Sequence, residues 1–517
     1  RFSCLTCICE TRNLHKHPQS TKFDRLGELN NIDEKKDTLS EIKIKLGSLN
    51  NREIEDISHN SDFGCLFTEL TSNDREFIEL ICDILRALSS ALEPGEIYRR
   101  YSAELSRLIT HPDPTVRVFV LHEILCIASS PQRVSQLVAD TTLLVAIVNK
   151  ITDDDLSVSK SAMSVMKKIG QHANGLHALY TGELLRSFAR LLAKNDHVSF
   201  RIYEVVVDVA KSSKEGLEAS ARSGFLNSLI NLLENDDILL QLNVLEIMSE
   251  LALTEEGLDY LEQQDVLRNL VQKIAHASQN PLSNLLIPGL MKFFGNVAQH
   301  WPDEIFSKYP LVVSALFEVI ESGDQTILGV ALDTLGHVST SIEGKYALQA
   351  LDDAMPCALK KITEIIQSMP TELRIRGLNN LALILDVKKP QQDNRILSLT
   401  KSWFDSLCDD PLGMIVTLCR QPFADIRQAG LEVLVVVASQ VWGQEYMSTY
   451  PGLIEFLLDR NVETFKECKE VKYEVVKHLS EAERDIFDAS TMQKLKDFVN
   501  QGPYYVEINV EVAIEGL

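Results

Sequence analysis

Apolar residues recur along the middle of this chain at the spacing of one face of an α-helix. Counted from Asp155, they fall seven, ten, eleven and fourteen residues later, at Ala162, Val165, Met166 and Ile169. The same stripe follows Asp196, Asp237 and Asp324, giving in turn Tyr203, Val206, Val207 and Ala210, then Val244, Ile247, Met248 and Leu251, then Ala331, Thr334, Leu335 and Val338. This i, i+3, i+4, i+7 spacing predicts an amphipathic helix in each repeat.

Each predicted helix is framed by an Asp and a Gly. Asp155, Asp196 and Asp237 are 41 residues apart, and a Gly lies 20 residues after each of them and after Asp324. These glycines are Gly175, Gly216, Gly257 and Gly344. We expect each Asp to accept hydrogen bonds from the first turn of its helix. We expect each Gly to adopt φ > 0 in a chain reversal between two helices.

A helical repeat of about 40 to 47 residues is typical of armadillo and HEAT proteins. With 517 residues, the chain is also too long for one ordinary hydrophobic core. The sequence therefore predicts an all-α fold, an armadillo/HEAT-like right-handed superhelical α-solenoid, over residues 73–500.

Three further segments flank the predicted solenoid. Residues 23–72 are charged and weakly amphipathic, and we expect a helical cap there. Residues 501–517 are expected to form an extended tail. Residues 1–22 are set apart from the fold as a leader without stable structure. Cys4, Cys7, Cys9, His15 and His17 lie in that leader, but they lack a second paired cluster at a usual zinc spacing, so no metal site is predicted.

The formal charge of -23 changes the choice of partners. Because a surface with this much negative charge repels a phosphate backbone, nucleic acid is an unfavourable partner. No apolar run approaches the roughly 18 residues that span a bilayer, so no membrane association is predicted. The ten cysteines are scattered, as in reduced proteins of the cytosol or nucleus. We expect a cytoplasmic protein, with the nucleus as a second location, that is monomeric when free.

No catalytic motif is present. The sequence lacks G-x-x-x-x-G-K-[ST], G-x-G-x-x-G, G-x-S-x-G and H-E-x-x-H, and its twelve histidines are dispersed. We therefore expect no enzyme activity, no catalytic residues, no cofactor and no metal.

A solenoid without a catalytic site is expected to bind other proteins along a concave wall. Matching positions of successive repeats carry a polar pair at i, i+4, so that both members share one helix face. The predicted binding ladder consists of Arg186 and Arg190, Asn227 and Asn231, Arg268 and Gln272, and Ser314 and Glu318. Ordinary solvated surface explains the same pattern equally well.

Several short motifs carry a family resemblance from about residue 75 to the end. They are Pro288-Gly289-x-x-Lys292-Phe293-Phe294-Gly295-Asn296, Tyr309-Pro310, Glu343-Gly344-Lys345, Trp403-Phe404-x-Ser406-Leu407-x-x-Asp410-Pro411-Leu412, Gln421-Pro422-Phe423 and Gly502-Pro503-Tyr504-Tyr505-Val506. In order and spacing they resemble the family of non-ATPase regulatory subunit 5 of the 26S proteasome.

That resemblance implies an assembly chaperone of the proteasome base. Its implied partners are AAA ATPase subunits, one of them held by its C-terminal domain, and a large non-ATPase scaffold subunit. Holding that domain would delay docking of the ATPase on the core particle. The first 70 or so residues look different from the family.

The alternative is a generic armadillo-type adaptor for transport or signalling. A transport receptor would show a regular ladder of Trp and Asn, but Trp301, Trp403 and Trp442 do not recur at the repeat period.

Overall fold

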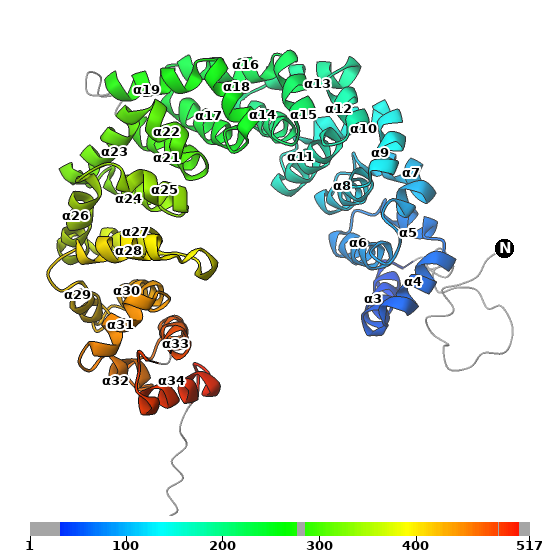
Figure 1. The fold of residues 1–517 in the computed structure, drawn as a ribbon. Coiled ribbons are helices and arrows are strands. Elements are labelled where there is room, and N and C mark those ends of the chain that lie inside the picture. The colour runs from blue at the N-terminus through cyan, green and yellow to red at the C-terminus, as the bar shows by residue number, and fades with distance from the viewer. Residues whose placement is uncertain (1–30, 277–284, 484, 506–517) are drawn as a thin grey trace, which may run out of the picture. The chain divides into compact units, whose positions relative to one another are not determined.

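The computed structural model describes residues 31–276, 285–483 and 485–505, and every regular element in these ranges is a helix (Figure 1). The predicted all-α solenoid class is confirmed, whereas the right-handed superhelix and the boundaries at residues 22, 72 and 500 stay predictions. The chain forms two compact units, residues 1–235 with 254–260 (unit 1) and residues 236–253 with 261–517 (unit 2).

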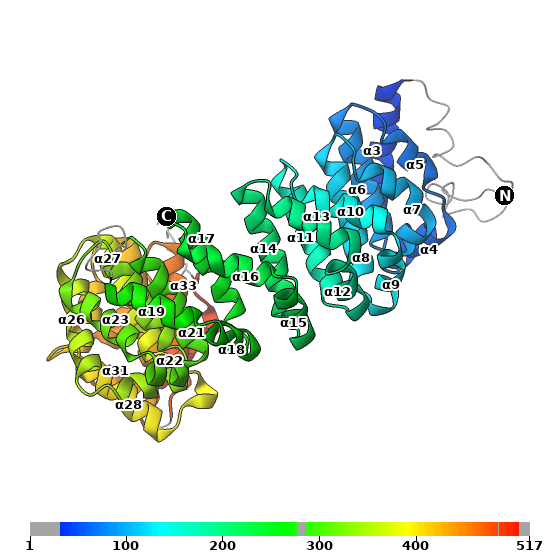
Figure 2. The same ribbon diagram turned by 90° about the horizontal axis from the view of Figure 1, so that it is seen from above.

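Unit 1 repeats a group of three helices. The groups are α8 (Pro114–Ala128), α9 (Pro131–Ala139) and α10 (Thr141–Lys150); α11 (Leu156–Gly170), α12 (Ala173–Leu179) and α13 (Gly182–Leu192); and α14 (Asp196–Ala210), α15 (Lys214–Arg222) and α16 (Phe225–Asn231), followed by η1 (Leu232–Glu234). The first helices α8, α11 and α14 pack side by side in one row, α10 packs on α13 in a second, and α9 packs on α12. Figure 2 shows the short α9, α12 and α15 along one edge of the unit.

Five helices precede these groups. They are α3 (Ile32–Ser48), α4 (Asn51–Asn60), α5 (Gly64–Glu69), α6 (Arg75–Ser89) and α7 (Glu96–Leu108). Helix α3 packs on α6, and α6 packs on α8. Leu39 and Phe67 are fully buried. The part of the predicted cap that the structure describes is therefore helical and shares the core of unit 1.

Unit 2 continues the three-helix groups. They are α17 (Ile238–Leu251), α18 (Glu255–Gln263, divided between the units) and α19 (Val266–His276); α21 (Ile287–His300), α22 (Pro302–Lys308) and α23 (Pro310–Ser322); α24 (Leu328–Val338), α25 (Ile342–Gln349) and α26 (Ala354–Ser368); α27 (Thr371–Leu385), α28 (Asn394–Asp405) and α29 (Pro411–Leu418); α30 (Ala424–Ala438), α31 (Val441–Thr449) and α32 (Leu453–Leu458); then α33 (Lys466–Ser480) and α34 (Ala489–Gln501). The first helices α17, α21, α24, α27, α30 and α33 form one row, and α19, α23 and α26 form another. Figure 1 shows the row from α21 to α33 on the inner side of the curve of this unit.

The predicted aspartate caps are partly correct. Asp155 and Asp237 are N-caps, and each accepts from two backbone N–H groups of its helix, as expected. Asp196 is not the cap, because Asn195 accepts from the Val198 N–H and α14 begins at Asp196. Asp324 is not a cap either. It accepts from the Thr326 N–H in the turn before α24, whose N-cap is Ile327.

The predicted left-handed glycines are wrong, and another constraint explains the period. Gly175, Gly216, Gly257 and Gly344 lie inside the short second helices, and none of them has positive φ. A Cβ on Gly175, Gly216 or Gly344 would lie 2.0, 2.4 or 1.9 Å from a backbone oxygen in the last turn of the preceding helix. Gly is needed there because the start of the second helix packs directly against the backbone of the first.

Candidate functional site

All eight residues of the predicted ladder are exposed. Each pair lies on one helix, as the i, i+4 spacing predicts. Arg186 and Arg190 lie on α13 and Asn227 and Asn231 on α16 in unit 1, and Arg268 and Gln272 lie on α19 and Ser314 and Glu318 on α23 in unit 2.

Several ladder residues already have partners within the chain. Arg190 Nη2 is 2.7 Å from Glu183 Oε1, and Arg268 Nη1 is 2.9 Å from Asp265 Oδ1. The Tyr260 hydroxyl donates to Asn227 Oδ1 at 2.9 Å. These are exposed contacts of neighbouring side chains, which are individually weak and can be exchanged for contacts with a partner.

The ladder helices are the third helices of their groups. In unit 2, Figure 1 shows α19 and α23 on the outer side of the curve, opposite the row from α21 to α33. A concave wall in this unit is therefore lined by first helices, which carry none of the eight residues. That the ladder binds a partner stays a prediction.

The inner row of unit 2 carries a loop with a firmly fixed base. Residues 386–393 connect α27 to α28 and include the short 3-10 helix η3 (Lys389–Gln391). The last carbonyls of α27 have no partner within the helix. Lys345 Nζ donates to Leu383 O at 3.3 Å and to Ile384 O at 2.7 Å. Gln440 Nε2 donates to Leu385 O at 2.8 Å.

The two side chains that bind these carbonyls are themselves held. Lys345 is fully buried, and burial lowers its pKa to about 7, although the Asp386 carboxylate acts in the opposite direction. Gln440 Oε1 accepts from Thr400 Oγ1 at 2.6 Å and from Trp442 Nε1 at 2.9 Å. Because every member of this buried network is paired, it fixes the base of the loop.

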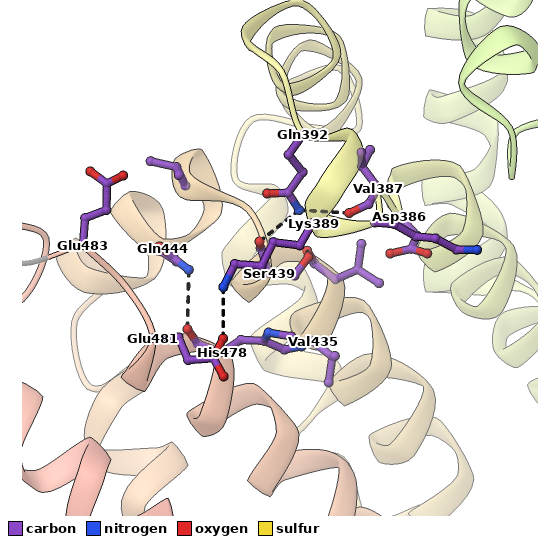
Figure 3. Close-up of a pocket in the computed structure, with 13 residues that line it drawn as sticks. Asp386, Val387, Lys389, Gln392, Val435, Ser439, Gln444, His478, Glu481 and Glu483 are labelled. Carbon is purple, nitrogen blue, oxygen red and sulfur yellow. Dashed lines mark hydrogen bonds and ion pairs between the residues drawn. The ribbon is translucent and has the colours of Figure 1, made fainter.

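The loop borders an open cavity of about 270 Å³ at the ends of α30 and α33. Figure 3 shows Gln392 and Lys389 reaching from the loop toward Ser439 and Glu481. Gln392 Nε2 donates to Ser439 O at 3.1 Å, and Lys389 Nζ lies 3.1 Å from Glu481 Oε2. The cavity combines apolar walls from Val435 and Val436 with both signs of charge, which suits a polar protein segment better than a small apolar ligand.

A second open cavity, of about 430 Å³, lies between α17 and α21. Its lining includes Pro288, Gly289, Lys292 and Phe293 from one of the motifs that carry the resemblance. Lys292 Nζ lies 2.6 Å from Glu246 Oε2 across this surface. The motif therefore contributes surface as well as core to the inner row of unit 2.

A larger open cavity, of about 800 Å³, lies in unit 1 beside α12 and α15. Two of its polar groups hold the structure, since His172 Nε2 is bonded to Ala128 O and the Tyr180 hydroxyl to Ser220 Oγ. Within the described ranges, no group of three or more His, Cys, Asp or Glu is placed to hold a metal ion. The cysteines and histidines of the leader lie outside the described residues.

No helix among the described residues is long and apolar enough to cross a bilayer.

Comparison with known proteins decides the family. The family described as "Proteasome non-ATPase 26S subunit" matches residues 19–516. The chain belongs to this family.

Curated members of the proteasome non-ATPase 26S subunit family align over most of the chain. The human 26S proteasome non-ATPase regulatory subunit 5 is 35% identical over 456 residues, which cover 88% of this chain and 90% of the human protein. The bovine protein of the same name is 33% identical over 95% of this chain and 98% of its own length. The Drosophila melanogaster protein is 28% identical over 85% of each chain. Family membership gives the chain a proteasome-related role.

A solved structure adds nothing to this assignment. An engineered protein aligns with 84% of this chain and 100% of its own at 17% identity, but the TM-score is 0.38.

Sequence reasoning missed the fixed loop of unit 2. Residues 388–394 are polar in sequence, and nothing local shows that Lys345 and Gln440, both distant in sequence, bind the carbonyls at the base of the loop. The sequence offered one sign of this network, because the charged residue Lys345 lies in one of the motifs that carry the family resemblance.

Proposed function

We propose that this chain is an assembly chaperone for the base of the 26S regulatory particle. It binds the C-terminal domain of one AAA ATPase subunit and sterically delays docking of that subunit on the core particle, in an intermediate that includes a large non-ATPase scaffold subunit. The observation that carries the proposal is the family match over residues 19–516, with relatives named as proteasome regulatory subunits.

The structure supports a function by binding. The two cavities of the inner row of unit 2 are open, and their lining mixes apolar, acidic and basic side chains. The fixed loop presents Lys388 and Lys389 to solvent. A site that is ordered before binding loses less conformational entropy when the partner arrives. Such a surface holds a protein domain by contact and needs no turnover.

The tryptophans weigh against the adaptor alternative. Trp403 and Trp442 are only 3% and 5% exposed. Trp301 donates its indole N–H to Ala252 O at 3.0 Å. All three serve the packing of unit 2, so they do not form the exposed Trp ladder of a transport receptor.

The deciding experiment is a pull-down of the purified full chain against the isolated C-terminal domains of all six proteasomal ATPases. Selective capture of one domain is the expected result. Capture of none by a folded chain contradicts the proposal and favours a generic adaptor. The proposal also places the protein in the cytosol or nucleus, which cell fractionation tests.

The ladder has its own test within this function. Reversing the charge at Arg186 and Arg268 together should weaken capture of the ATPase domain without changing helicity or melting temperature. The side chains of these two residues are 71% and 73% exposed. The matched control is charge reversal at Arg75 and Arg99, whose side chains are 78% and 72% exposed. Unchanged affinity would remove the ladder from the binding surface.

A further inference from the structure

The described residues of both units contain the same ionic junction. Arg117 donates through Nη1 to His111 O at 2.6 Å and to Pro112 O at 2.7 Å, and through Nη2 to Asp153 at 2.9 Å. Arg427 donates through Nη1 to Gln421 O at 3.0 Å and to Pro422 O at 2.9 Å, and its Nε and Nη2 bind Glu463 at 2.8 and 2.9 Å. In both, the Arg and the acid are 36 residues apart. The two junctions can therefore be compared position by position.

The comparison shows a difference at the caps of the helices. In unit 1 the N-caps of α8 and α11 are Asp113 and Asp155, and both carboxylates accept from backbone N–H groups. The equivalent residues in unit 2 are Phe423 and Phe465, the N-caps of α30 and α33, and neither makes a side-chain cap. A phenyl ring cannot accept these hydrogen bonds. Phe at these two N-cap positions therefore makes each helix less stable than Asp would.

Burial does not explain the two rings either. Phe423 is 60% exposed and Phe465 is 51% exposed, and Val462 beside them is also 51% exposed. A single exposed apolar residue such as Leu156 needs no explanation, but two exposed rings at capping positions, against local helix preference, mark a candidate functional site.

The starts of α30 and α33 lie side by side, since the Cys468 thiol donates to Ala424 O at 3.4 Å. The guanidinium of Arg427 is 5.4 Å from the centre of the Phe465 ring and bonds to the carbonyl that precedes Phe423. Its carboxylate partner, Glu463, directly follows Val462. Phe423, Val462 and Phe465 are all exposed and adjoin the residues of this ion pair, and they are here named the aromatic edge.

The charge beside the aromatic edge is acidic. The charge of Arg427 is matched by Glu463 at the centre of the edge. Asp425 and Glu467 each follow a Phe by two residues and are exposed, and neither has an ion pair among the described residues. Two exposed cations are close in sequence, and both have partners: Lys466 lies 3.8 Å from Glu470, and Arg420 lies over the Phe456 ring at 4.9 Å. An apolar surface with two available carboxylates complements an apolar side chain that has Lys or Arg on either side.

We propose that the aromatic edge is a docking site for a segment of a protein partner in which apolar side chains are flanked by basic ones. The inference rests on the proposed function only for the source of that segment, a subunit of the proteasome base. The rings of Phe423 and Phe465 provide the apolar contact, while Asp425 and Glu467 orient the basic residues. Aromatic side chains suit this role because they give a large contact area at little cost in conformational entropy.

The first arm of the test is photo-crosslinking. Benzoylphenylalanine replaces Phe423 in the full chain, which is then mixed with purified subunits of the proteasome base, and the crosslinked peptide is sequenced. The control position is Leu156, which is 55% exposed and adjoins the capping Asp155 of the unit 1 junction. We expect a crosslink from position 423 to a segment with Lys or Arg beside apolar residues, and none from position 156. A yield at 423 no greater than at 156 overturns the proposal.

The second arm uses the unit 1 junction as a template. Phe423→Asp with Phe465→Asp installs the residues that cap α8 and α11, so folding is retained or improved. We expect at least a tenfold loss of affinity for the crosslinked subunit, and less than a twofold change for Leu156→Asp. Equal affinity of the double variant and the wild type overturns the proposal.

The two proposals fail differently. If none of the six ATPase domains is captured but position 423 crosslinks to a scaffold subunit, the proposed chaperone function fails and the docking site stands. If an ATPase domain is captured with equal affinity by the double variant, the chaperone function stands and the docking site fails.

Discussion

Lys345 offers a test of how the inner row of unit 2 is held together. Its side chain is fully buried, and its nitrogen donates hydrogen bonds to two carbonyl oxygens at the end of α27. The ordinary pKa of 10.5 falls to about 7 in the folded chain because burial disfavours the charged form. The perturbation is Lys345→Met, which keeps the length and the apolar stem of the side chain and removes the titrating group.

The sign of the effect follows from proton binding. Between pH 7 and 10.5 the unfolded chain holds a proton on Lys345 that the folded chain has lost, so stability rises with pH in that window. Each pH unit adds about 1.4 kcal/mol to the free energy of unfolding, so the rise from pH 7 to pH 9.5 adds about 3 kcal/mol. The neutral amine keeps two N–H donors for the two carbonyls, so the hydrogen bonds survive the loss of the proton.

Tryptophan fluorescence is the assay because Trp301, Trp403 and Trp442 all lie in unit 2 with Lys345. Urea unfolding of the wild type and Lys345→Met is followed at pH 7 and pH 9.5. Other titrating groups are shared by the two proteins and cancel in the difference. Between the two pH values, the free energy of unfolding of the wild type should rise by about 3 kcal/mol more than that of the variant. Parallel pH dependence of the two proteins would refute the assignment of a buried, easily neutralised Lys345.

Three further changes test the packing. Arg427→Met leaves Glu463, 5% exposed, without its cation and should cost about 3–5 kcal/mol in urea unfolding followed by tryptophan fluorescence, whereas Arg427→Met with Glu463→Leu should recover at least half of that loss. Gly344→Ala places a Cβ 1.9 Å from Val338 O and should cost about 1–3 kcal/mol in thermal unfolding, while Gly47→Ala, with no atom within 4 Å, should be neutral or stabilising. Phe423→Asp adds a missing cap and should stabilise by about 0.5–2 kcal/mol; a loss of stability would show that the ring contributes to packing.

The sequence by itself determined the helices and their period. The stripe after Asp155 is buried in α11, with Ala162, Val165, Met166 and Ile169 fully enclosed. A hydrophobic face needs only local spacing to be recognised, because the 3.6-residue turn of the helix fixes which side chains share a face. The aspartate caps at Asp155 and Asp237 were predictable for the same reason, since a cap bonds within its own first turn.

Tertiary structure decided the role of the glycines. The 41-residue spacing of Gly175 and Gly216 showed that a small residue is required, but not why. The requirement is the approach of one helix start to the backbone of the helix before it. That approach is a property of the packed pair, so a reading of each turn in isolation assigned positive φ instead.

Tertiary structure also decided which polar residues hold the core and which face a partner. Lys345 reaches α27 across 39 residues of sequence, and Arg427 reaches Glu463 across 36. The predicted ladder was chosen by register alone, and register cannot tell the outer side of a curved row from its inner side. Phe423 and Phe465 are large apolar residues of the kind that cores contain, yet they are 60% and 51% exposed. Local periodicity determines which elements form, whereas the exposure of a side chain depends on how distant elements pack around it.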